Sequence, residues 1–360
     1  MPGNSFGQNF RITTCGESHG KAISVIIDGC PPQLPLNESM IQVMMDRRKP
    51  GSSAASTKRK EPDHVSIMSG VFEGKTTGTP ILIMIENKDA DPRAYSKNVQ
   101  LFRPGHGDIT YTAKYGIRDW RGGGRASARE TAARVAAGAV AMILLNQYDI
   151  HIYAYTLCLG GVVATQRDFS VIHQNPYGSP DLEAALLMEK RVAEVKAKGD
   201  SLGGIVEIVA QGVPMGLGEP VFDKLDADLA KALMSVGAVK GVEIGAGFAC
   251  AQLLGSENND PIMSNGFQQN NAGGILAGIS NGDDIVVRVA VKPIPSIIIE
   301  QDTIDHQKQP HRISTQGRHD ISAIPRINVV LEAMTAIVIA DHLLRQQTLQ
   351  LNKPPCYFEL

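Results

Sequence analysis

Three short segments of the sequence place a histidine or an aspartate beside glycine and arginine. They are residues 16–20 (GESHG), 103–108 (RPGHGD) and 317–320 (GRHD). A histidine in a glycine-flanked loop can act as a general acid or as a contact for an anion. Ser18 and His19 are adjacent, and adjacent side chains seldom face each other, so a serine hydrolase triad is not indicated. The alternatives are loop histidines without a chemical role and, for Arg318 and Asp320, an ion pair on the surface.

A run of three glycines, residues 122–124, opens another basic segment. Arg125, Ser127 and Arg129 follow, at what we expect to be the first turn of a helix. The free N–H groups of a helix start attract phosphate, and side chains one turn apart can reach the same anion. The segment therefore predicts an anion site, and the alternative is a glycine hinge before a solvated helix start.

Positive charge is concentrated locally although the whole chain is nearly neutral, with 35 Lys and Arg against 37 Asp and Glu. Residues 47–60 hold six Lys or Arg and no acid, and residues 103–134 hold seven against three acids. Basic segments interleaved with glycine favour a pocket for a multiply charged small molecule. Nucleic acid is disfavoured, because its binding domains usually have a basic excess and stacking aromatics, and only 5% of this chain is aromatic.

Several well-known site patterns are absent from the sequence. The glycine run lacks the Gly-Lys-Ser/Thr ending of a P-loop and the spacing of a dinucleotide-binding turn, and there is no HExxH. The five cysteines are scattered without a C-x-x-C pair, so we expect no metal site, no disulfide framework and a reducing compartment.

The elements that must position these residues mix strands and helices without the regular alternation of a doubly wound sheet. We expect strands at 22–27, 80–86 and 284–291, and helices at 38–48, 126–145 and 325–345. The polar segment 300–314 is the best candidate for a mobile loop.

No targeting or membrane segment is expected. Residues 1–20 lack a basic stretch followed by an apolar one, so they do not predict a signal peptide. The longest apolar stretch, 132–145, contains Arg134 and is shorter than the ~20 residues of a membrane span.

One internal similarity suggests a duplicated core. Gly70, Gly74 and Gly78 lead into one strand at the spacing with which a second set, Gly274, Gly278 and Gly282, leads into another. A long Ala-rich or aliphatic helix follows each. We therefore predict two similar strand–helix halves that pack together, with chance in a glycine-rich chain as the alternative.

The motifs together resemble one family. GESHG at 16–20, RPGH at 103–106, GGGRASARET at 122–131, VKGVEIG at 239–245 and GRHD at 317–320 are similar in order and spacing to chorismate synthases. The resemblance extends from about residue 7 to about residue 345. It implies an α+β fold, a β-α-β sandwich with a pseudo-duplicated core. Residues 1–360 would form one domain with two related halves of about 1–200 and 201–350.

The resemblance also implies an activity. The family converts 5-enolpyruvylshikimate 3-phosphate to chorismate and phosphate by anti-1,4-elimination, the last common step of the shikimate pathway of aromatic amino-acid biosynthesis. It needs reduced FMN, although the reaction has no net redox change. The substrate has two carboxylates and a phosphate, and FMN has a further phosphate, which would account for the basic segments, because guanidinium groups pair bidentately with such anions.

Roles for individual residues follow from the resemblance. His19 matches a histidine thought to assist the leaving phosphate, and His106 one thought to protonate or balance the reduced flavin. Asp320 matches the carboxylate proposed to help remove the ring hydrogen, and Ser18 and Ser127 match supporting hydroxyls. The substrate contacts would be Arg48, Arg103, Arg129 and Arg318. The FMN contacts would be Arg48, Arg125, Ala126, Ser127, Gly237, Ala238, Ala277, Lys292, Pro293, Ile294, Pro295, Ser296 and Arg318. The histidine chemistry calls for an imidazole that is protonated near neutral pH. Nearby arginines would lower its pKa and a bound phosphate would raise it, so we expect the proton to be held best when substrate is present.

The sequence departs from the family pattern at Ala54, where many members have an arginine thought to contact substrate or NADPH. Lys58 or Arg59 would have to substitute for it. The resemblance further implies a homotetramer, with electrons from NADPH or from an external flavin reductase. The nearly neutral charge and the lack of a targeting or membrane segment lead us to expect a cytoplasmic protein that binds neither nucleic acid nor membrane. The alternatives are an NADPH-dependent flavin reductase and a non-catalytic anion-binding protein. His19, His106 and Asp320 favour the lyase, because anion binding needs only the arginines.

Overall fold

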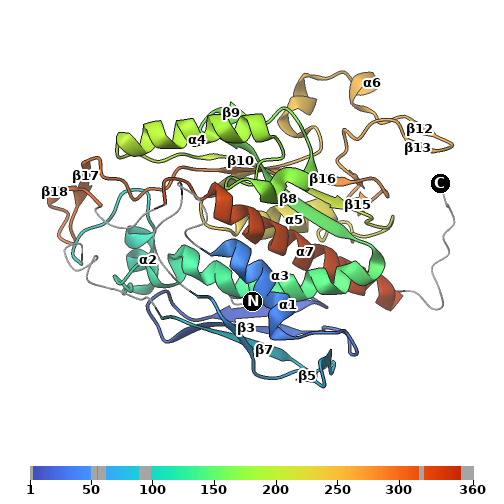
Figure 1. Cartoon of the computed structure of the whole chain (residues 1–360), viewed down its shortest axis with the longest axis horizontal. Coiled ribbons are helices and arrows are strands. Elements are labelled where there is room, and N and C mark those ends of the chain that lie inside the picture. Colours follow the sequence, from blue (N-terminus) through green and yellow to red (C-terminus); the bar gives the residue numbers. More distant parts are fainter. Residues whose placement is uncertain (1–2, 50–54, 56–61, 89–98, 316–319, 350–360) are drawn as a thin grey trace.

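A computed structural model of the chain describes residues 3–49, 55, 62–88, 99–315 and 320–349. Two antiparallel five-stranded sheets enclose a layer of helices (Figure 1). The first sheet has the order β1–β2–β3–β7–β4, formed by Ser5–Phe6, Arg11–Cys15, Ala22–Asp28, Ile81–Glu86 and Val65–Ile67. The second has the order β9–β8–β10–β16–β11, formed by Val162–Val163, His151–Leu159, Gly204–Gln211, Ile285–Val291 and Val239–Ile244. This is the α+β sandwich that the family resemblance implies.

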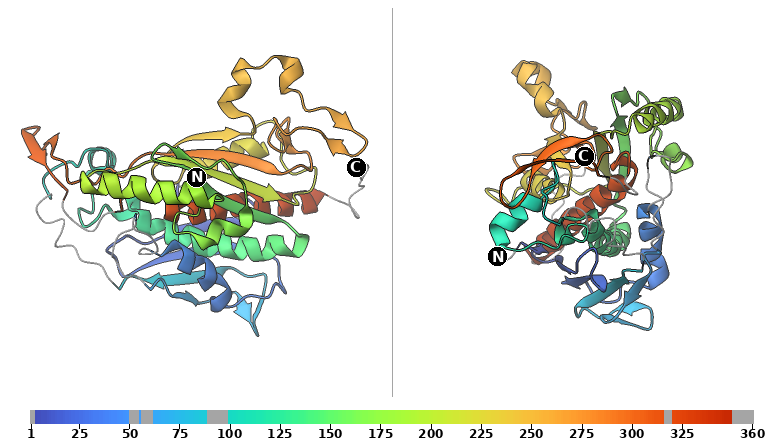
Figure 2. Two further views of the ribbon diagram at one scale, coloured as in Figure 1. Left: turned by 45° about the horizontal axis from the view of Figure 1, so that its top comes forward. Right: turned by 90° about the vertical axis from the view of Figure 1, so that its left-hand side faces the viewer.

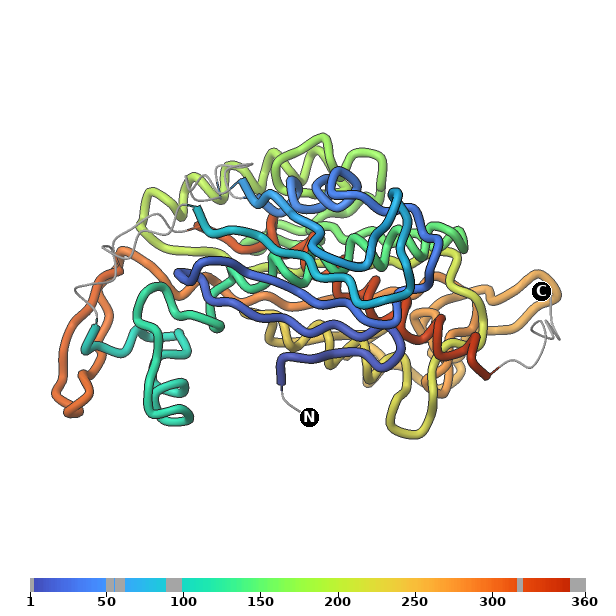
Figure 3. The backbone as a smooth tube through the Cα atoms, turned by 90° about the horizontal axis from the view of Figure 1, so that it is seen from below, coloured from blue at the N-terminus to red at the C-terminus, as the bar shows by residue number. Residues whose placement is uncertain are grey.

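Alternation along the central strands turns one face of each sheet toward the helices. In β7, Ile81, Ile83 and Ile85 are fully buried, whereas Leu82 and Met84 between them are partly exposed. β16 follows the same pattern. Seen from the side of the first sheet, its strands lie across the front of the helical layer (Figure 3).

The helical layer consists of α1 (Glu38–Arg48), α3 (Thr131–Leu145), α5 (Leu225–Met234) and α7 (Ile324–Leu349). α1 begins at Asn37, whose side-chain oxygen accepts the N–H of Met40 at 3.1 Å. Gly138 lets α3 approach α7 closely, because a Cβ at that position would lie 2.3 Å from the Cβ of Ala333. α7 is long and apolar enough to cross a membrane, more so than the predicted stretch 132–145, but its apolar part is wholly buried as a core helix.

The core is duplicated, as predicted. Hairpin β5–β6 (Val71–Phe72 and Lys75–Thr76) precedes β7, and hairpin β14–β15 (Ile275–Leu276 and Ile279–Ser280) precedes β16. The six glycines of the two sets all have positive φ, between 74° and 95°. α1 and α5 connect equivalent strands of the two sheets, and α3 and α7 follow the equivalent strands β7 and β16.

The two hairpins are also fastened in the same way. The Thr76 hydroxyl accepts the Leu34 N–H at 3.0 Å and donates to the Pro31 carbonyl at 2.6 Å. The Ser280 hydroxyl accepts the Leu217 N–H at 2.8 Å and donates to the Pro214 carbonyl at 2.6 Å. A division near residue 200 would fall between β8 and β10, which are neighbours in one sheet. We therefore propose one domain whose second half begins just before β8, at about residue 150.

Several elements lie outside the sandwich. α4 (Leu182–Ala197) flanks the second sheet, and α2 (Asp108–Tyr115) lies at one end of the molecule beside hairpin β17–β18 (Gln301–Ile304 and Pro310–Ile313). An arm with α6 (Gly255–Asn258), β12 (Ile262–Met263) and β13 (Gly266–Phe267) projects from the body (Figure 2).

The structure refines two predicted segments. Segment 300–314, the candidate mobile loop, contains the β-hairpin β17–β18, whose turn is closed by the Asp305 carboxylate accepting the N–H groups of Gln307 and Gln309. The helix expected from residue 126 begins only at Thr131. Two 3₁₀ turns, Gly124–Ala126 and Ala128–Glu130, precede it, separated by extended Ser127 (φ −75°, ψ 145°).

Candidate active site

The loop between β2 and β3 contains Ser18 and His19. Contrary to the expectation for neighbouring residues, their side chains do face each other, with Ser18 Oγ 3.0 Å from His19 Nδ1. The Ser18 hydroxyl also donates to the Arg121 carbonyl at 3.3 Å. His19 lies against Gly122, where a Cβ would be 2.4 Å from His19 Cε1 and where φ is 82°. The glycine run therefore permits close packing of the imidazole as well as a left-handed turn.

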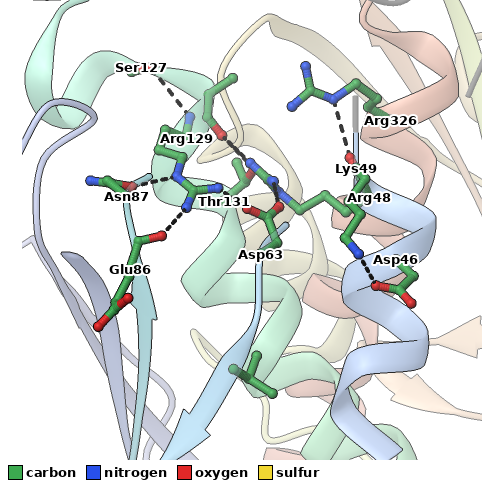
Figure 4. Close-up of polar contacts among 12 residues, drawn as sticks. Asp46, Arg48, Lys49, Asp63, Glu86, Asn87, Ser127, Arg129, Thr131 and Arg326 are labelled. Carbon is green, nitrogen blue, oxygen red and sulfur yellow. Dashed lines mark hydrogen bonds and ion pairs between the residues drawn. The ribbon is translucent and has the colours of Figure 1, made fainter. Parts of the chain in front are cut away.

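Two arginines and one aspartate form a buried ionic cluster beside this loop (Figure 4). Arg48 Nη1 donates to one oxygen of the Asp63 carboxylate at 2.8 Å, and Arg129 Nη1 donates to the other oxygen. Arg48 is 2% exposed, Arg129 8% and Asp63 0%. Burial, followed by the nearby charge of Arg326, lowers the pKa of Arg48 to about 10. Two cations share one anion here, so the cluster has a net positive charge.

Asn87 links the Arg129 side chain to the histidine loop. The Asn87 side-chain oxygen accepts Arg129 Nε–H at 2.8 Å. Its amide nitrogen donates to the carbonyls of Glu17 at 3.0 Å and Gly20 at 2.9 Å. One side chain therefore holds both ends of the loop that contains His19.

Arg125 and Arg129 do not reach one common anion position, contrary to the expectation from their spacing. Arg125 donates to the Gly16 carbonyl at 3.2 Å and to Thr14 Oγ1 at 2.7 Å, whereas Arg129 turns to Asp63. The extended backbone at Ser127 separates the two side chains, since the spacing of one helical turn applies only within a helix. Arg125 thus holds the start of the loop that contains His19, through Thr14 and Gly16.

A second ionic cluster lies in the segment that contains His106. Arg103 makes two side-chain bonds of 2.8 Å to the Asp108 carboxylate, and Arg118 lies 3.4 Å from the same group. Arg103 Nη2 is close to Gly123, where an added Cβ would be 3.6 Å away. Arg103 therefore connects the His106 loop to the glycine run and through it to His19.

His106 is held at both ring nitrogens. Nδ1 lies 3.1 Å from the Pro104 carbonyl, and Nε2 lies 2.9 Å from Ser296 Oγ. A carbonyl oxygen can only accept, so Nδ1 carries the proton and Nε2 accepts from the serine. Burial and then the charge of Arg103 lower the pKa of His106 to about 4. His106 is therefore neutral near pH 7 in this structure, and Arg103 lowers its pKa, as the sequence leads us to expect of a nearby arginine.

The segment after β16 packs on the His106 loop. Lys292 Nζ donates to the Gly105 carbonyl at 2.8 Å, and a Cβ on Gly105 would be 2.7 Å from Pro295. The Lys292 N–H donates to the Ala238 carbonyl at 2.9 Å, which places Gly237 and Ala238 beside this segment. An open hollow of about 530 Å³ adjoins His106, between its loop and hairpin β17–β18.

Asp320 joins the first ionic cluster from the start of α7. Its carboxylate accepts Arg326 Nη1–H at 2.8 Å and is 15% exposed. Arg326 Nε donates to the Arg48 carbonyl at 3.3 Å. Contacts therefore run from Asp320 through Arg326 and Arg48 to Asp63, Arg129, Asn87 and the His19 loop.

Comparisons with known proteins identify the family. The family model described as chorismate synthase matches residues 10–344. A chorismate synthase of Desulfosudis oleivorans is 66% identical over 97% of this chain and 99% of its own length. One of Nitratidesulfovibrio vulgaris (strain Hildenborough) is 57% identical over 98% of this chain and 100% of its own. A crystal structure of a chorismate synthase has a TM-score of 0.77 at 35% identity, covering 95% of this chain and 93% of that chain.

The chain belongs to the chorismate synthase family. It is a lyase of the shikimate pathway that forms chorismate and phosphate from 5-enolpyruvylshikimate 3-phosphate. The sequence left two alternatives open, a flavin reductase and a non-catalytic anion-binding protein. Membership of this family excludes both as the main function of the chain.

Not every residue matched to the chorismate synthase pattern lies with the others. Exposed Ala277 is in the turn of hairpin β14–β15, before β16, whereas Lys292 follows β16, so the strand separates them. Ala126 is beside Gly107, where a Cβ would be 3.7 Å from the Ala126 Cβ. Arg318, Ala54, Lys58 and Arg59 lie outside the described residues.

Sequence reasoning missed four residues that hold the site of this chorismate synthase together. They are Asp63, Asn87, Asp108 and Arg326. A signal existed for Asp63 and Asp108, because an acid close to a basic segment is a natural partner for a buried arginine. No comparable signal marks Asn87, whose role depends on the end of β7 meeting a loop distant in sequence.

Proposed function

We propose that the elimination takes place between the His19 loop, the His106 loop and Asp320, with the substrate's anions held by the arginines among them. The observation that carries the proposal is the continuous set of contacts from Asp320 to the His19 loop through two buried, cationic arginines. A small polyanion is the ligand that such an excess of buried positive charge favours.

The arginines supply both charge and orientation. Arg48, Arg103 and Arg129 are each fixed by a carboxylate, and Arg318 would add a fourth guanidinium. Guanidinium groups held in advance cost little to order when carboxylate or phosphate groups bind. We propose that they bind the two carboxylates and the phosphate of the substrate.

Ser18 and His19 serve the leaving phosphate in this proposal. The Ser18 hydroxyl holds one ring nitrogen of His19 and so sets the orientation of the imidazole. A donor aimed at the departing phosphate oxygen stabilises the charge that develops there. Ser127 is a supporting hydroxyl, and in the structure its Oγ accepts the Arg129 N–H at 3.4 Å.

Asp320 is the carboxylate that we assign to the ring hydrogen. Arg326 fixes one of its oxygens at 2.8 Å, and the group is only partly buried. A general base must reach the proton that it removes, and a held, partly accessible carboxylate meets this requirement.

Reduced FMN is the cofactor that we propose. The segment Lys292–Ser296, with Pro293, Ile294 and Pro295 between, would hold it together with Gly237, Ala238 and His106. This group fits a flavin: Lys292 is a cation for its phosphate, Gly237 has no heavy atom within 4 Å of an added Cβ, and His106 adjoins an open hollow. When bound, reduced flavin supplies electron density as phosphate leaves and recovers it as the hydrogen departs. Arg125, Ala126, Ser127 and Arg48 lie on the His19 side, and Ala277 lies beyond β16.

His106 controls a proton beside that cofactor position. Its neutral ring can accept a proton at Nε2, and a nearby anion would raise its pKa from about 4 toward neutrality. The imidazole would therefore become protonated when the anionic ligands are bound, which is when the chemistry needs the charge.

The source of electrons is either NADPH or a separate flavin reductase. Ala54 removes one arginine that an NADPH site would use, and Lys58 or Arg59 would have to take its place. Titration of NADPH against Lys58→Ala tests that substitution, and an unchanged affinity would exclude Lys58.

We further propose a homotetramer in the cytoplasm. Large apolar side chains are exposed on the projecting arm, including Phe248 (79%), Leu254 (68%) and Ile262 (65%), and such exposure is typical of an interface. Cys15, Cys30, Cys158 and Cys250 in the described part are free thiols, which suits a reducing compartment. Sedimentation analysis tests the assembly, and a monomer at micromolar concentration would contradict it.

An anaerobic assay tests the flavin dependence. The full chain is mixed with substrate and either dithionite-reduced FMN, oxidised FMN, or oxidised FMN with NADPH. Chorismate and an equal amount of phosphate are expected with reduced FMN and not with oxidised FMN. Product formation without any reduced flavin would exclude the proposed cofactor, and product in the third mixture would assign the electrons to NADPH.

A further inference from the structure

Asp63 has an unusual position for an acidic residue. Its side chain is fully buried, and its backbone has a left-handed φ of 49°. Its two carboxylate oxygens are divided between two arginines, Arg48 and Arg129. Removal of this group would leave two buried cations without their shared anion.

Arg129 is held at all three of its guanidinium nitrogens. Nη1 donates to Asp63, Nε to the Asn87 side-chain oxygen at 2.8 Å, and Nη2 to the Glu86 carbonyl at 3.2 Å. The planar group therefore cannot rotate unless these bonds break. A fixed guanidinium plane presents its remaining N–H groups in one direction, which is the requirement for oriented binding of an anion.

Asn87 does a second task with its amide nitrogen. It donates to the carbonyls of Glu17 and Gly20, so the loop that contains Ser18 and His19 is tied at both ends. The same side chain thus fixes the distance between an anion-binding arginine and a catalytic histidine loop.

We propose that Asp63 and Asn87 are positioning residues of the reaction. They hold Arg129 between them and fix its position relative to the Ser18–His19 loop. The proposal rests on the roles proposed above for Arg129 and His19. Asp63 and Asn87 act through Arg129 and through backbone carbonyls. Asp63 fixes the orientation of Arg48 and Arg129, and Asn87 fixes the position of the Ser18–His19 loop.

Two opposite effects compete when the Asp63 charge is removed. The local charge becomes more positive, which by itself would strengthen binding of an anion. The arginines also lose their common anchor, which would weaken oriented binding. Bonds to charged groups contribute enough that the second effect should prevail, by about ten- to hundredfold in affinity.

Asp63→Asn tests the role proposed for Asp63. We expect the dissociation constant of 5-enolpyruvylshikimate 3-phosphate, measured by calorimetry without flavin, to rise about ten- to hundredfold. The matched control is Glu207→Gln, because Glu207 is 6% exposed and also lies between two arginines, at 2.8 Å from Arg167 and 3.4 Å from Arg288. The control should lose stability but keep substrate affinity. Unchanged or tighter binding by folded Asp63→Asn would overturn the role of Asp63.

Asn87→Asp tests the role proposed for Asn87, at a partly buried position where the new carboxylate can still pair with Arg129. The aspartate retains an acceptor for Arg129 but cannot donate to the two carbonyls. We expect kcat to fall about tenfold or more while substrate affinity stays within about threefold. The control is Asn175→Asp, since the Asn175 amide likewise donates to two backbone carbonyls, of Val171 at 3.1 Å and Ser179 at 2.8 Å. A wild-type kcat in Asn87→Asp would overturn the role of Asn87.

A further variant, Arg129→Gln, distinguishes a failure of these positioning roles from a failure of the proposed function. If Arg129→Gln binds substrate as tightly as the wild type, the assigned role of Arg129 is wrong, and the positioning roles are overturned with it. If Arg129→Gln loses affinity but Asp63→Asn and Asn87→Asp behave as the wild type, only the positioning roles are overturned. Substrate binding is read without flavin, so this comparison holds whatever supplies the electrons.

Discussion

The two halves of the core end their central strand in a similar way but hold the adjacent histidine loop with different chemistry. β7 is followed by Asn87, whose amide donates to the carbonyls of Glu17 and Gly20 in the His19 loop. β16 is followed by Lys292, whose ammonium donates to the Gly105 carbonyl in the His106 loop. In both halves of the duplicated core, the residue that follows the central strand therefore acts as a tether that holds a histidine loop. The type of that side chain determines the local charge.

The difference between the tethers is one of charge. The Asn87 amide is neutral, whereas Lys292 is one of the groups that lower the pKa of His106, after burial and Arg103. Lys292 itself has a lowered pKa, because it is partly desolvated and near Lys240. One loop is therefore held without added charge, and the other is held by a cation that helps to lower the pKa of its imidazole.

Removal of either imidazole should have the largest effect on turnover. His19→Ala and His106→Ala should each lower kcat by about 10²–10⁴-fold, the usual contribution of general acid–base catalysis. The control is His151→Ala, at the exposed start of β8. Near-normal turnover in either variant would remove that histidine from the mechanism.

The pH dependence of stability should reveal the buried His106. Its pKa is about 4 in the folded chain against an ordinary 6.5, so between these pH values the unfolded chain binds a proton that the folded chain does not. Stability contributed by this residue is therefore present above pH 6.5 and lost as the pH falls toward 4. Between pH 7 and pH 5 the loss should be about 2 kcal/mol, measured by urea unfolding. His106→Gln should abolish this contribution, and an unaltered pH dependence in that variant would refute it.

Replacement of the Lys292 ammonium by an apolar side chain should alter both the pKa of His106 and turnover. Lys292→Met should raise the pKa of His106, because one of its lowering charges is gone, and should reduce turnover about tenfold through loss of the bond to Gly105. Asn87→Ala should leave the pKa of His106 unchanged, since it removes no charge. NMR titration of the imidazole in both variants checks this, and equal shifts would contradict it.

The smallest expected effect concerns the equivalent hairpins. Thr76→Val and Ser280→Ala each remove a hydroxyl, both 2% exposed, that accepts one backbone N–H and donates to one carbonyl. Each should lower the free energy of unfolding by about 1 kcal/mol without altering turnover. A large loss from one hairpin and none from the other would show that the two halves are not equivalent in stability.

The main elements were predictable because their signals are local. α1 begins and ends where its Asn37 cap and basic last turn indicate, and β7 and β16 are regular apolar runs. The glycine spacing predicted two similar halves, and in the structure each of these glycines has a positive φ in or beside the hairpin that precedes β7 or β16. The start of α3 was wrong by five residues, since Ser127 caps a 3₁₀ turn rather than the helix itself.

The candidate site was predictable only as a set of residue types. The two histidine loops and the basic segments could be named from the sequence, but their partners could not. Asp63 and Asn87 act across contacts of 66 and 67 residues, to Arg129 and Gly20 respectively, and such pairings depend on the packing of the sheet against α3. The neutral state of His106 likewise depends on burial, which sequence spacing does not report.

A single-turnover experiment with Asp320→Asn tests whether this carboxylate takes part in the elimination. Wild type and variant are mixed anaerobically with reduced FMN and 5-enolpyruvylshikimate 3-phosphate, and phosphate and chorismate are measured together, with substrate affinity determined separately. We predict equal amounts of both products from the wild type, and retained substrate binding with a loss of chorismate formation of about 10²-fold or more in the variant. Chorismate formed by Asp320→Asn at the wild-type rate would contradict the account.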